Sequence, residues 1–268
     1  VNEEWISDKT RFSYDGLKYQ RLDVPMVRVA AKLAPAAWDE AYEAVEHKLL
    51  RTKPESVGAI AGDLTDVETM LSMKELMTAI GSNNYDCRAE GSNIENSERS
   101  LYIFNTSIAG IEKSDFCLII GSNPRHEATI LNARIRKATL QNNMKVALVG
   151  EEVDLTYKYK YLGENPWILK QIAEDQNPFC KVLSQYKNPM MIIGSGMAER
   201  SDWEATLYYT KKIAQKFGFV KDGWNGYNVL QRDASRVGGL DIGFLPKKGG
   251  MNAKQILAGA EVIFLLGA

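Results

Sequence analysis

Short apolar runs alternate with stretches of helical periodicity along this chain, and no other feature restricts its fold as strongly. Each run is about five residues long and is followed by a glycine, which is typical of strands buried on both faces. Between the runs, apolar residues recur at helical spacing. This alternation predicts an α/β fold, Rossmann-like, with mostly parallel sheets flanked by helices. The predicted strands are Val57–Ala61, Asp115–Gly121, Val146–Gly150, Met190–Ile193 and Val262–Leu266.

The expected helices have recognisable ends. Two capping boxes, in which a Ser or Thr precedes a Glu by three positions, predict helix starts at Thr65 and Ser201. Gly81 and Gly218 predict where those helices end. Pro35 predicts the start of an earlier helix. Three other stretches are predicted to be irregular, the second of them alternatively an exposed strand: 81–100, 156–162 and 222–252.

Composition excludes several classes of function. The net charge is −1, and no basic face of the kind that binds nucleic acid is visible. No apolar run approaches the length that crosses a bilayer, so any membrane association would come through a partner. The three cysteines, Cys87, Cys117 and Cys180, form no C-x-x-C pair, which favours a reducing compartment. Cys117 lies in an apolar run, which predicts a buried, inert thiol.

A candidate anion pocket follows the second predicted strand. Gly121 makes the turn, Asn123 can cap the next helix, and Arg125 adds a positive charge. Gly194 and Gly196 follow a later strand in the same way, but no third glycine completes a dinucleotide fingerprint. Such turns also occur in parallel α/β folds that bind no phosphate, and structural glycines are the alternative interpretation.

No catalytic or metal-binding set emerges from the residues. Ser195 lies between two glycines but lacks the longer G-x-S-x-G pattern. His126 is interpreted as a polar residue in the first turn of its helix. The carboxylates of residues 90–98 and 151–152 lack metal-ligand spacing and are interpreted as solvated surface. We therefore expect no catalytic residue and no metal ligand.

The chain is expected to be a piece of a larger protein, incomplete at both ends. It begins at Val1 rather than Met, and it stops shortly after the apolar run that ends at Leu266. A strand of this kind normally leads into a crossover helix.

Several long strings closely resemble the large iron–sulfur subunit of respiratory complex I, NADH:quinone oxidoreductase. The most specific string is Gly121-Ser122-Asn123-Pro124-Arg125-His126-Glu127-Ala128, continuing as Leu131-Asn132-Ala133-Arg134-Ile135-Arg136. The others are Asn2 to Phe12, Tyr14 to Leu17, Pro25 to Arg28, Tyr85 to Arg88, Asp154 to Tyr157 and Leu240 to Pro246. Together they extend along the whole chain.

The resemblance implies a domain plan and a set of cofactors. Residues 1–28 would be the tail of a preceding iron–sulfur region, 29–185 an α/β lobe, and 186–268 a second, truncated lobe that can interleave with the first. The 2Fe–2S and 4Fe–4S clusters would be bound in a region preceding Val1. The resemblance also implies kinship with molybdopterin oxidoreductases, in which turns like that at Gly121 hold a pterin dinucleotide.

Two functions from different classes follow. The favoured one is a cofactor-free scaffold within the cluster-bearing subunit, with other peripheral-arm subunits as partners and contact with the membrane only through the complex. The complex would lie on the cytoplasmic side of the bacterial inner membrane, or on the mitochondrial matrix side. The alternative is a molybdopterin-dependent oxidoreductase domain of the formate dehydrogenase type, with Cys87 as the one candidate molybdenum ligand.

A free-standing nucleotide-binding protein is a weaker third interpretation. The aromatic-rich start and the Trp224 region are the expected interaction surfaces.

Overall fold

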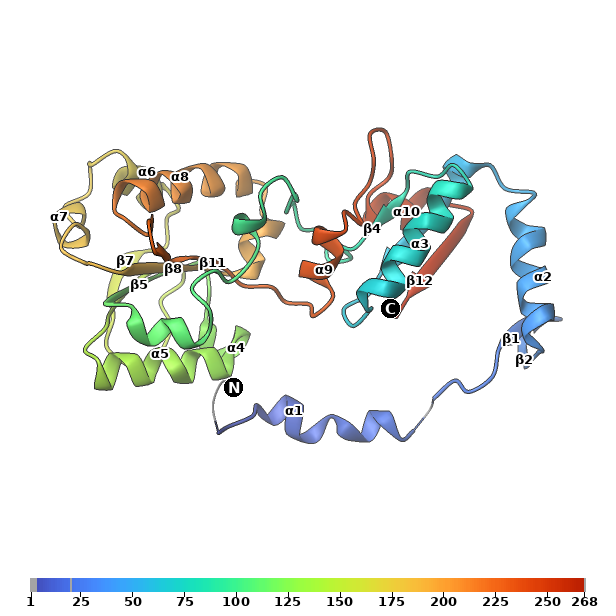
Figure 1. The fold of residues 1–268 in the computed structure, drawn as a ribbon, viewed down its shortest axis with the longest axis horizontal. Coiled ribbons are helices and arrows are strands. Elements are labelled where there is room, and N and C mark those ends of the chain that lie inside the picture. Colours follow the sequence, from blue (N-terminus) through green and yellow to red (C-terminus); the bar gives the residue numbers. More distant parts are fainter. Residues whose placement is uncertain (1–3, 20, 268) are drawn as a thin grey trace. The chain divides into compact units, whose positions relative to one another are not determined.

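The computed structural model describes residues 4–19 and 21–267, and contacts divide the chain into two compact units (Figure 1). Unit 1 is formed mainly by Ser92–Val237, and unit 2 by Ile6–Gly91 together with the stretch from Gly238 onwards. The boundary expected between residues 185 and 186 does not separate two lobes. Strand β8 (Pro189–Ile193) pairs with β5 (Phe116–Ile120) inside one sheet, across that boundary.

Unit 1 contains a five-stranded sheet in the order β11-β8-β5-β6-β7, and every neighbouring pair in it is parallel. The other three strands are β6 (Lys145–Val149), β7 (Lys160–Gly163) and β11 (Tyr227–Val229). The chain runs outward from β5 through β6 to β7, and then returns to the other side of β5 to form β8 and β11. Strand order therefore reverses between β5 and β8, which makes this pair the topological switch point of the sheet.

Helices cover both faces of this sheet. In Figure 1, α4 (Pro124–Glu127) and α5 (Thr129–Gln141) lie on one face, and α6 (Trp167–Ala173) and α8 (Trp203–Lys216) lie on the other. All five residues of β5 are buried, because its alternate side chains enter a core on each side. Ile119 packs in a cluster with Ile135 of α5, whereas the Phe116 ring stacks on Tyr186 with ring centroids 4.5 Å apart.

Unit 2 is built on a smaller parallel sheet in the order β12-β3-β4. Its strands are β3 (Val57–Ala61), β4 (Tyr85–Asp86) and β12 (Val262–Leu266), and its helices include α3 (Val67–Ala79) and α10 (Ala253–Gly259). Strand β3 is fully buried, and Ile60 packs in a cluster with Ile256 of α10. The parallel α/β class predicted from the sequence is confirmed in both units.

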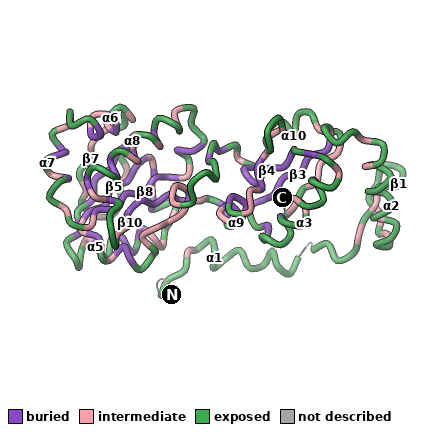
Figure 2. The backbone as a smooth tube through the Cα atoms, turned by 45° about the horizontal axis from the view of Figure 1, so that its top comes forward, coloured by how far each residue is buried: buried purple, intermediate pink, exposed green. Residues whose placement is uncertain are grey.

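The described residues from 4 to 56 form no buried core of their own. None of the described residues between 4 and 56 is buried, and Figure 2 shows this stretch almost entirely as exposed or intermediate. It contains α1 (Asp8–Phe12), the antiparallel strands β1 (Met26–Val29) and β2 (Lys32–Pro35), and α2 (Trp38–Leu49). Large apolar side chains are among its exposed residues, including Trp5, Phe12, Leu17 and Trp38.

Some local expectations were wrong. Pro35 ends β2 instead of beginning a helix, and α2 starts three residues later. Asp66, not Thr65, caps α3, because its side chain accepts the Thr69 N–H, while the Thr65 hydroxyl donates to the carbonyl of Leu266. Three short strands, β4, β10 (Trp224–Asn225) and β11, lie in stretches that were expected to be irregular. Within the described residues, every helix is too short or too polar to span a lipid bilayer.

The remaining elements are short. They are α7 (Cys180–Leu183), β9 (Val220–Lys221), β10 (Trp224–Asn225) and α9 (Arg236–Asp241). Trp224, expected to be part of an interaction surface, is half-buried against the core of unit 1, and its indole N–H donates to the carbonyl of Pro189 at 2.8 Å.

Asn228 fixes the edge strand β11 through its fully buried amide. The side-chain oxygen accepts the Thr106 N–H at 2.8 Å, and the nitrogen donates to the Thr106 hydroxyl at 2.7 Å and to the Met191 carbonyl at 3.0 Å. Replacing Asn228 by Leu would leave buried polar groups without partners. We expect Asn228→Leu to lower the free energy of unfolding by about 2 kcal/mol or more.

Urea denaturation would measure this effect, with Asn142→Leu as the matched control. Asn142 is exposed, and its amide donates to the Glu112 carbonyl at the surface. The control is expected to change stability by about 0.5 kcal/mol or less. Equal midpoints for the two variants would contradict the role of Asn228.

Candidate functional site

The candidate site lies where β5 and β8 end. In an open parallel sheet, the crevice outside the carboxyl ends of the strands at the switch point is the usual ligand site. The loop after β5 carries Gly121 and Asn123, and the loop after β8 carries Gly194 and Gly196. The sheet thus brings together the four glycine and asparagine positions that the sequence analysis singled out.

The two loops are in direct backbone contact. A Cβ atom on Gly194 would lie 2.3 Å from the carbonyl oxygen of Gly121. Gly121 has a φ of +57°, and a Cβ atom there would lie 2.1 Å from the sulfur of Met197. Gly194 therefore requires glycine for space, because the clash is with backbone, whereas Gly121 requires glycine for its backbone conformation.

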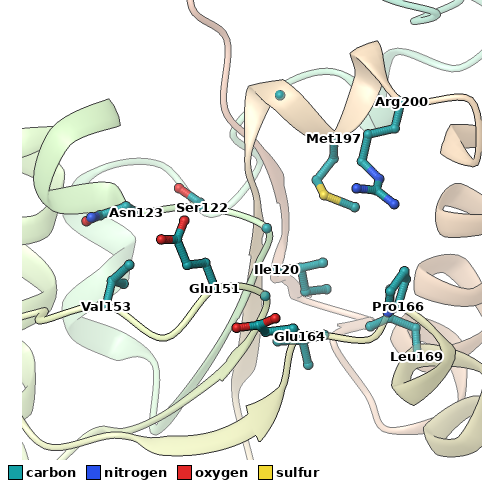
Figure 3. Close-up of a pocket in the computed structure, with 14 residues that line it drawn as sticks. Ile120, Ser122, Asn123, Glu151, Val153, Glu164, Pro166, Leu169, Met197 and Arg200 are labelled. Atoms are coloured by element: carbon teal, nitrogen blue, oxygen red, sulfur yellow. The ribbon is translucent and has the colours of Figure 1, made fainter.

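A cavity of about 360 Å³ opens beside this contact, over the ends of β5 and β6. Figure 3 shows Met197 and Arg200 reaching towards it from the segment after β8. Glu151 and Glu164 line it from the segments that follow β6 and β7. The lining set also includes Ile120, Asn123, Val153, Leu169 and Gly196.

The positive charges near the cavity are bound to carboxylates of the chain itself. The Arg200 guanidinium donates to both carboxylate oxygens of Asp202, at 2.7 and 2.8 Å. These bonds hold the pKa of the Asp202 carboxyl below its usual range. Arg125 donates to the Asp154 carboxylate at 2.9 Å, so its guanidinium is paired with the segment after β6.

Glu127 joins the two loops. One of its carboxylate oxygens accepts the Ser195 N–H at 2.6 Å, and the other accepts the Ser122 hydroxyl at 2.5 Å. Ser122 is buried, whereas Glu127 is exposed at the outer side of the loops. A backbone N–H that follows β8 is therefore already bonded to an anionic group of the chain.

The cysteines lie in other environments. Cys117 is fully buried in β5, and burial raises the pKa of its thiol, in agreement with the predicted inert residue. Cys87 lies in unit 2, where a Cβ atom on Gly239 would lie 2.8 Å from its sulfur. The described residues contain no group of three or more His, Cys, Asp or Glu side chains arranged to hold a metal ion.

Fold and switch-point site together define the class of this protein. The family model described as molybdopterin oxidoreductase matches residues 21–268, and the chain belongs to this family. A second model, the NADH-ubiquinone oxidoreductase NDSU1/NuoG-like, 4Fe-4S domain, matches residues 1–15.

Relatives narrow the family further. All 268 residues align at 44% identity with the G subunit of NADH-quinone oxidoreductase from Rickettsia bellii, of which the chain covers 38%. Likewise, the whole chain is 41% identical to the mitochondrial NADH dehydrogenase [ubiquinone] iron-sulfur protein 1 of Solanum tuberosum, covering 36% of that protein. A solved structure, acetylene hydratase from Pelobacter acetylenicus, aligns with 97% of this chain and 33% of its own, at 13% identity and a TM-score of 0.43. The chain thus spans less than half the length of each of these proteins.

A pterin dinucleotide does not fit the residues of this site. Its phosphates need free N–H donors and cations, and carboxylates at the site would repel them. Here Glu127 holds the Ser195 N–H, while Arg125 and Arg200 are paired with aspartates. Glu151 and Glu164 add negative charge to the cavity lining. The cavity lining includes no cysteine that could bind molybdenum.

Sequence reasoning found the glycines of the site but missed Glu127, Met197 and Arg200. Glu127 lies inside the most specific family string, but that string assigns it no contact, because its bond to Ser195 spans 68 positions of the sequence. The signal in the sequence for this site was the pair of glycine-containing turns. Such turns indicate where two loops approach closely, but they do not indicate which side chains contact the loops.

Gly194 and Gly196 provide a matched pair of substitutions in one loop. Because a Cβ atom on Gly194 would collide with the backbone of Gly121, we expect Gly194→Ala to lower the free energy of unfolding by about 2 kcal/mol or more. A Cβ atom on Gly196 would meet nothing within 4 Å. Gly196→Ala is therefore expected to change the free energy of unfolding by about 0.5 kcal/mol or less. Urea titration of both variants would check this, and a Gly194→Ala variant as stable as Gly196→Ala would show that the loops do not touch.

Proposed function

We propose that this chain is the α/β scaffold portion of a cluster-bearing subunit of NADH:quinone oxidoreductase, which transfers electrons from NADH towards quinone. The observation that carries the proposal is similarity over the whole of this chain, at 41–44% identity, to proteins named as that subunit. The match of residues 1–15 to a 4Fe–4S domain model supports the same role. The 2Fe–2S and 4Fe–4S clusters are then held by parts of the polypeptide that lie outside this chain.

The scaffold role rests on the chemistry of the switch-point site. A cofactor-binding member of the family would need donors and cations facing the crevice. This chain instead bonds them to its own carboxylates, at Glu127, Asp154 and Asp202. We infer that the domain supports the cluster-bearing region and contacts neighbouring subunits, and that it binds no cofactor of its own.

The exposed first segment supports an interaction with the rest of the complex. Its apolar side chains include Phe12 at 70% exposure and Leu17 at 72%, and none of its described residues is buried. Gathered exposed apolar groups commonly mark a surface that another protein covers. We infer that the cluster-bearing region and other subunits of the peripheral arm cover them. The complex would then hold this chain on the cytoplasmic side of a bacterial inner membrane, or on the mitochondrial matrix side.

Metal content separates the scaffold from a molybdopterin enzyme of the formate dehydrogenase type. The family match favours that second function, whereas the residues of the site do not. We expect the full-length protein, purified from its source, to contain iron but no molybdenum, as measured by mass spectrometry of the metals. Near-stoichiometric molybdenum would overturn the scaffold role.

Substitution of the exposed apolar residues tests the interaction surface. Phe12→Ser combined with Leu17→Ser should reduce the amount of protein recovered in the assembled complex by about fivefold or more, since apolar anchors dominate interface energies. Leu140→Ser is the control, because Leu140 is 62% exposed but lies on α5 of unit 1. Recovery of the double variant at the level of this control would contradict the proposed surface. Native gels of the assembled complex supply the measurement.

A further inference from the structure

We propose that Glu127 is a clamp whose carboxylate ties the loop after β5 to the loop after β8 and thereby closes the switch-point crevice to phosphate groups. The inference rests on the proposed function. It identifies Glu127 as the residue that allows this member of the family to keep the fold without a bound pterin dinucleotide. It concerns a residue to which neither the sequence motifs nor the relatives' names give a role.

The geometry of the carboxylate carries the proposal. Each of its two oxygens serves a different loop: one accepts the Ser195 N–H at 2.6 Å and the other the Ser122 hydroxyl at 2.5 Å. Hydrogen bonds that involve an ionised acceptor are short and stronger than neutral ones. A single side chain therefore occupies both donors, the Ser195 N–H and the Ser122 hydroxyl.

Local structure directs Glu127 to this position. Asn123 caps α4 by accepting the Arg125 N–H, and Pro124 occupies the first helical position. Helix α4 ends at Glu127, whose N–H donates to the Asn123 carbonyl at 2.9 Å. The one-turn helix thus returns the carboxylate to the loop from which the helix began, where Ser122 is buried.

Competition with phosphate follows from this arrangement. A phosphate at the switch point would need the Ser195 N–H, and it would meet the negative charge of Glu127 at the same place. Glu151 and Glu164 line the adjoining cavity and strengthen the repulsion. The cations that would offset it are paired elsewhere, Arg125 with Asp154 and Arg200 with Asp202.

Hydrogen–deuterium exchange of the full-length protein, followed by mass spectrometry of a peptide covering residues 190–199, tests the clamp. In Glu127→Ala, the loop after β8 loses its anchor, so the peptide should exchange about tenfold faster or more than in the unsubstituted protein. Glu164→Ala is the matched control, because it removes a carboxylate from the adjoining cavity without releasing the Ser195 N–H. The control peptide should exchange at the unsubstituted rate.

Inorganic pyrophosphate is the second probe. It should leave exchange in the unsubstituted protein and in Glu164→Ala unchanged, and it should slow exchange in Glu127→Ala, where the donors are free. Glu127→Gln keeps the size of the side chain but not its charge. It is expected to show an intermediate rate, and it provides the readout if Glu127→Ala does not fold.

Two results would overturn the proposal, and they differ in what they imply. If both Glu127 variants exchange as slowly as the unsubstituted protein, Glu127 is not the clamp, while the scaffold function still stands. If pyrophosphate protects the unsubstituted protein, the crevice is open to phosphate, and the cofactor-free function is overturned together with the clamp.

Discussion

The structure at the switch point depends on one constraint, the direct backbone contact between the loops after β5 and β8. Neighbouring parallel strands lie about 4.8 Å apart, so loops that leave them normally diverge to opposite faces and open a crevice. Here Gly194 lies against the carbonyl of Gly121. The Met197 side chain occupies the space that a side chain at position 121 would fill. The crevice is narrowed by the backbone itself, and the polar groups of the two loops must find partners within the chain.

Charged side chains supply those partners on both sides of the loop after β5. Arg125 connects it to the segment after β6 through Asp154, and Glu127 connects it to the loop after β8. The Arg125–Asp154 pair is largely exposed and contributes only about 0–1 kcal/mol. The Glu127 bonds differ in kind, because one of them satisfies the N–H of Ser195, which begins a helical turn and has no partner within that turn. Arg125 and Glu127 lie two residues apart in the sequence. Together they connect the segment after β5 to the segments after β6 and β8.

Sequence patterns predicted the framework of this fold better than its details. Strands β3 and β12 match the expected runs residue for residue, since a short apolar run followed by glycine leaves few alternatives to a strand. The expected burial on both faces holds for β3, whereas the residues of β12 are half-buried or exposed. Strands β4 and β11 have only two and three residues, and tertiary contacts such as those of Asn228 decide their pairing. The glycines of the site were predictable because backbone geometry demands them. Glu127 was not, because its partner is distant in sequence and exposed carboxylates are usually solvated.

A crevice narrowed by contacts within the chain changes the source of the stability of the domain. A cofactor-binding domain gains stability from its ligand by mass action, and the gain varies with ligand concentration. A domain whose loops are joined by Glu127 and by the Gly121–Gly194 contact derives that stability from its own sequence. On the proposed function this independence is an advantage, because a scaffold that supports redox centres must keep one geometry whether or not any small molecule is present. The family fold, on this view, is retained for its rigidity after its ligand site has been closed.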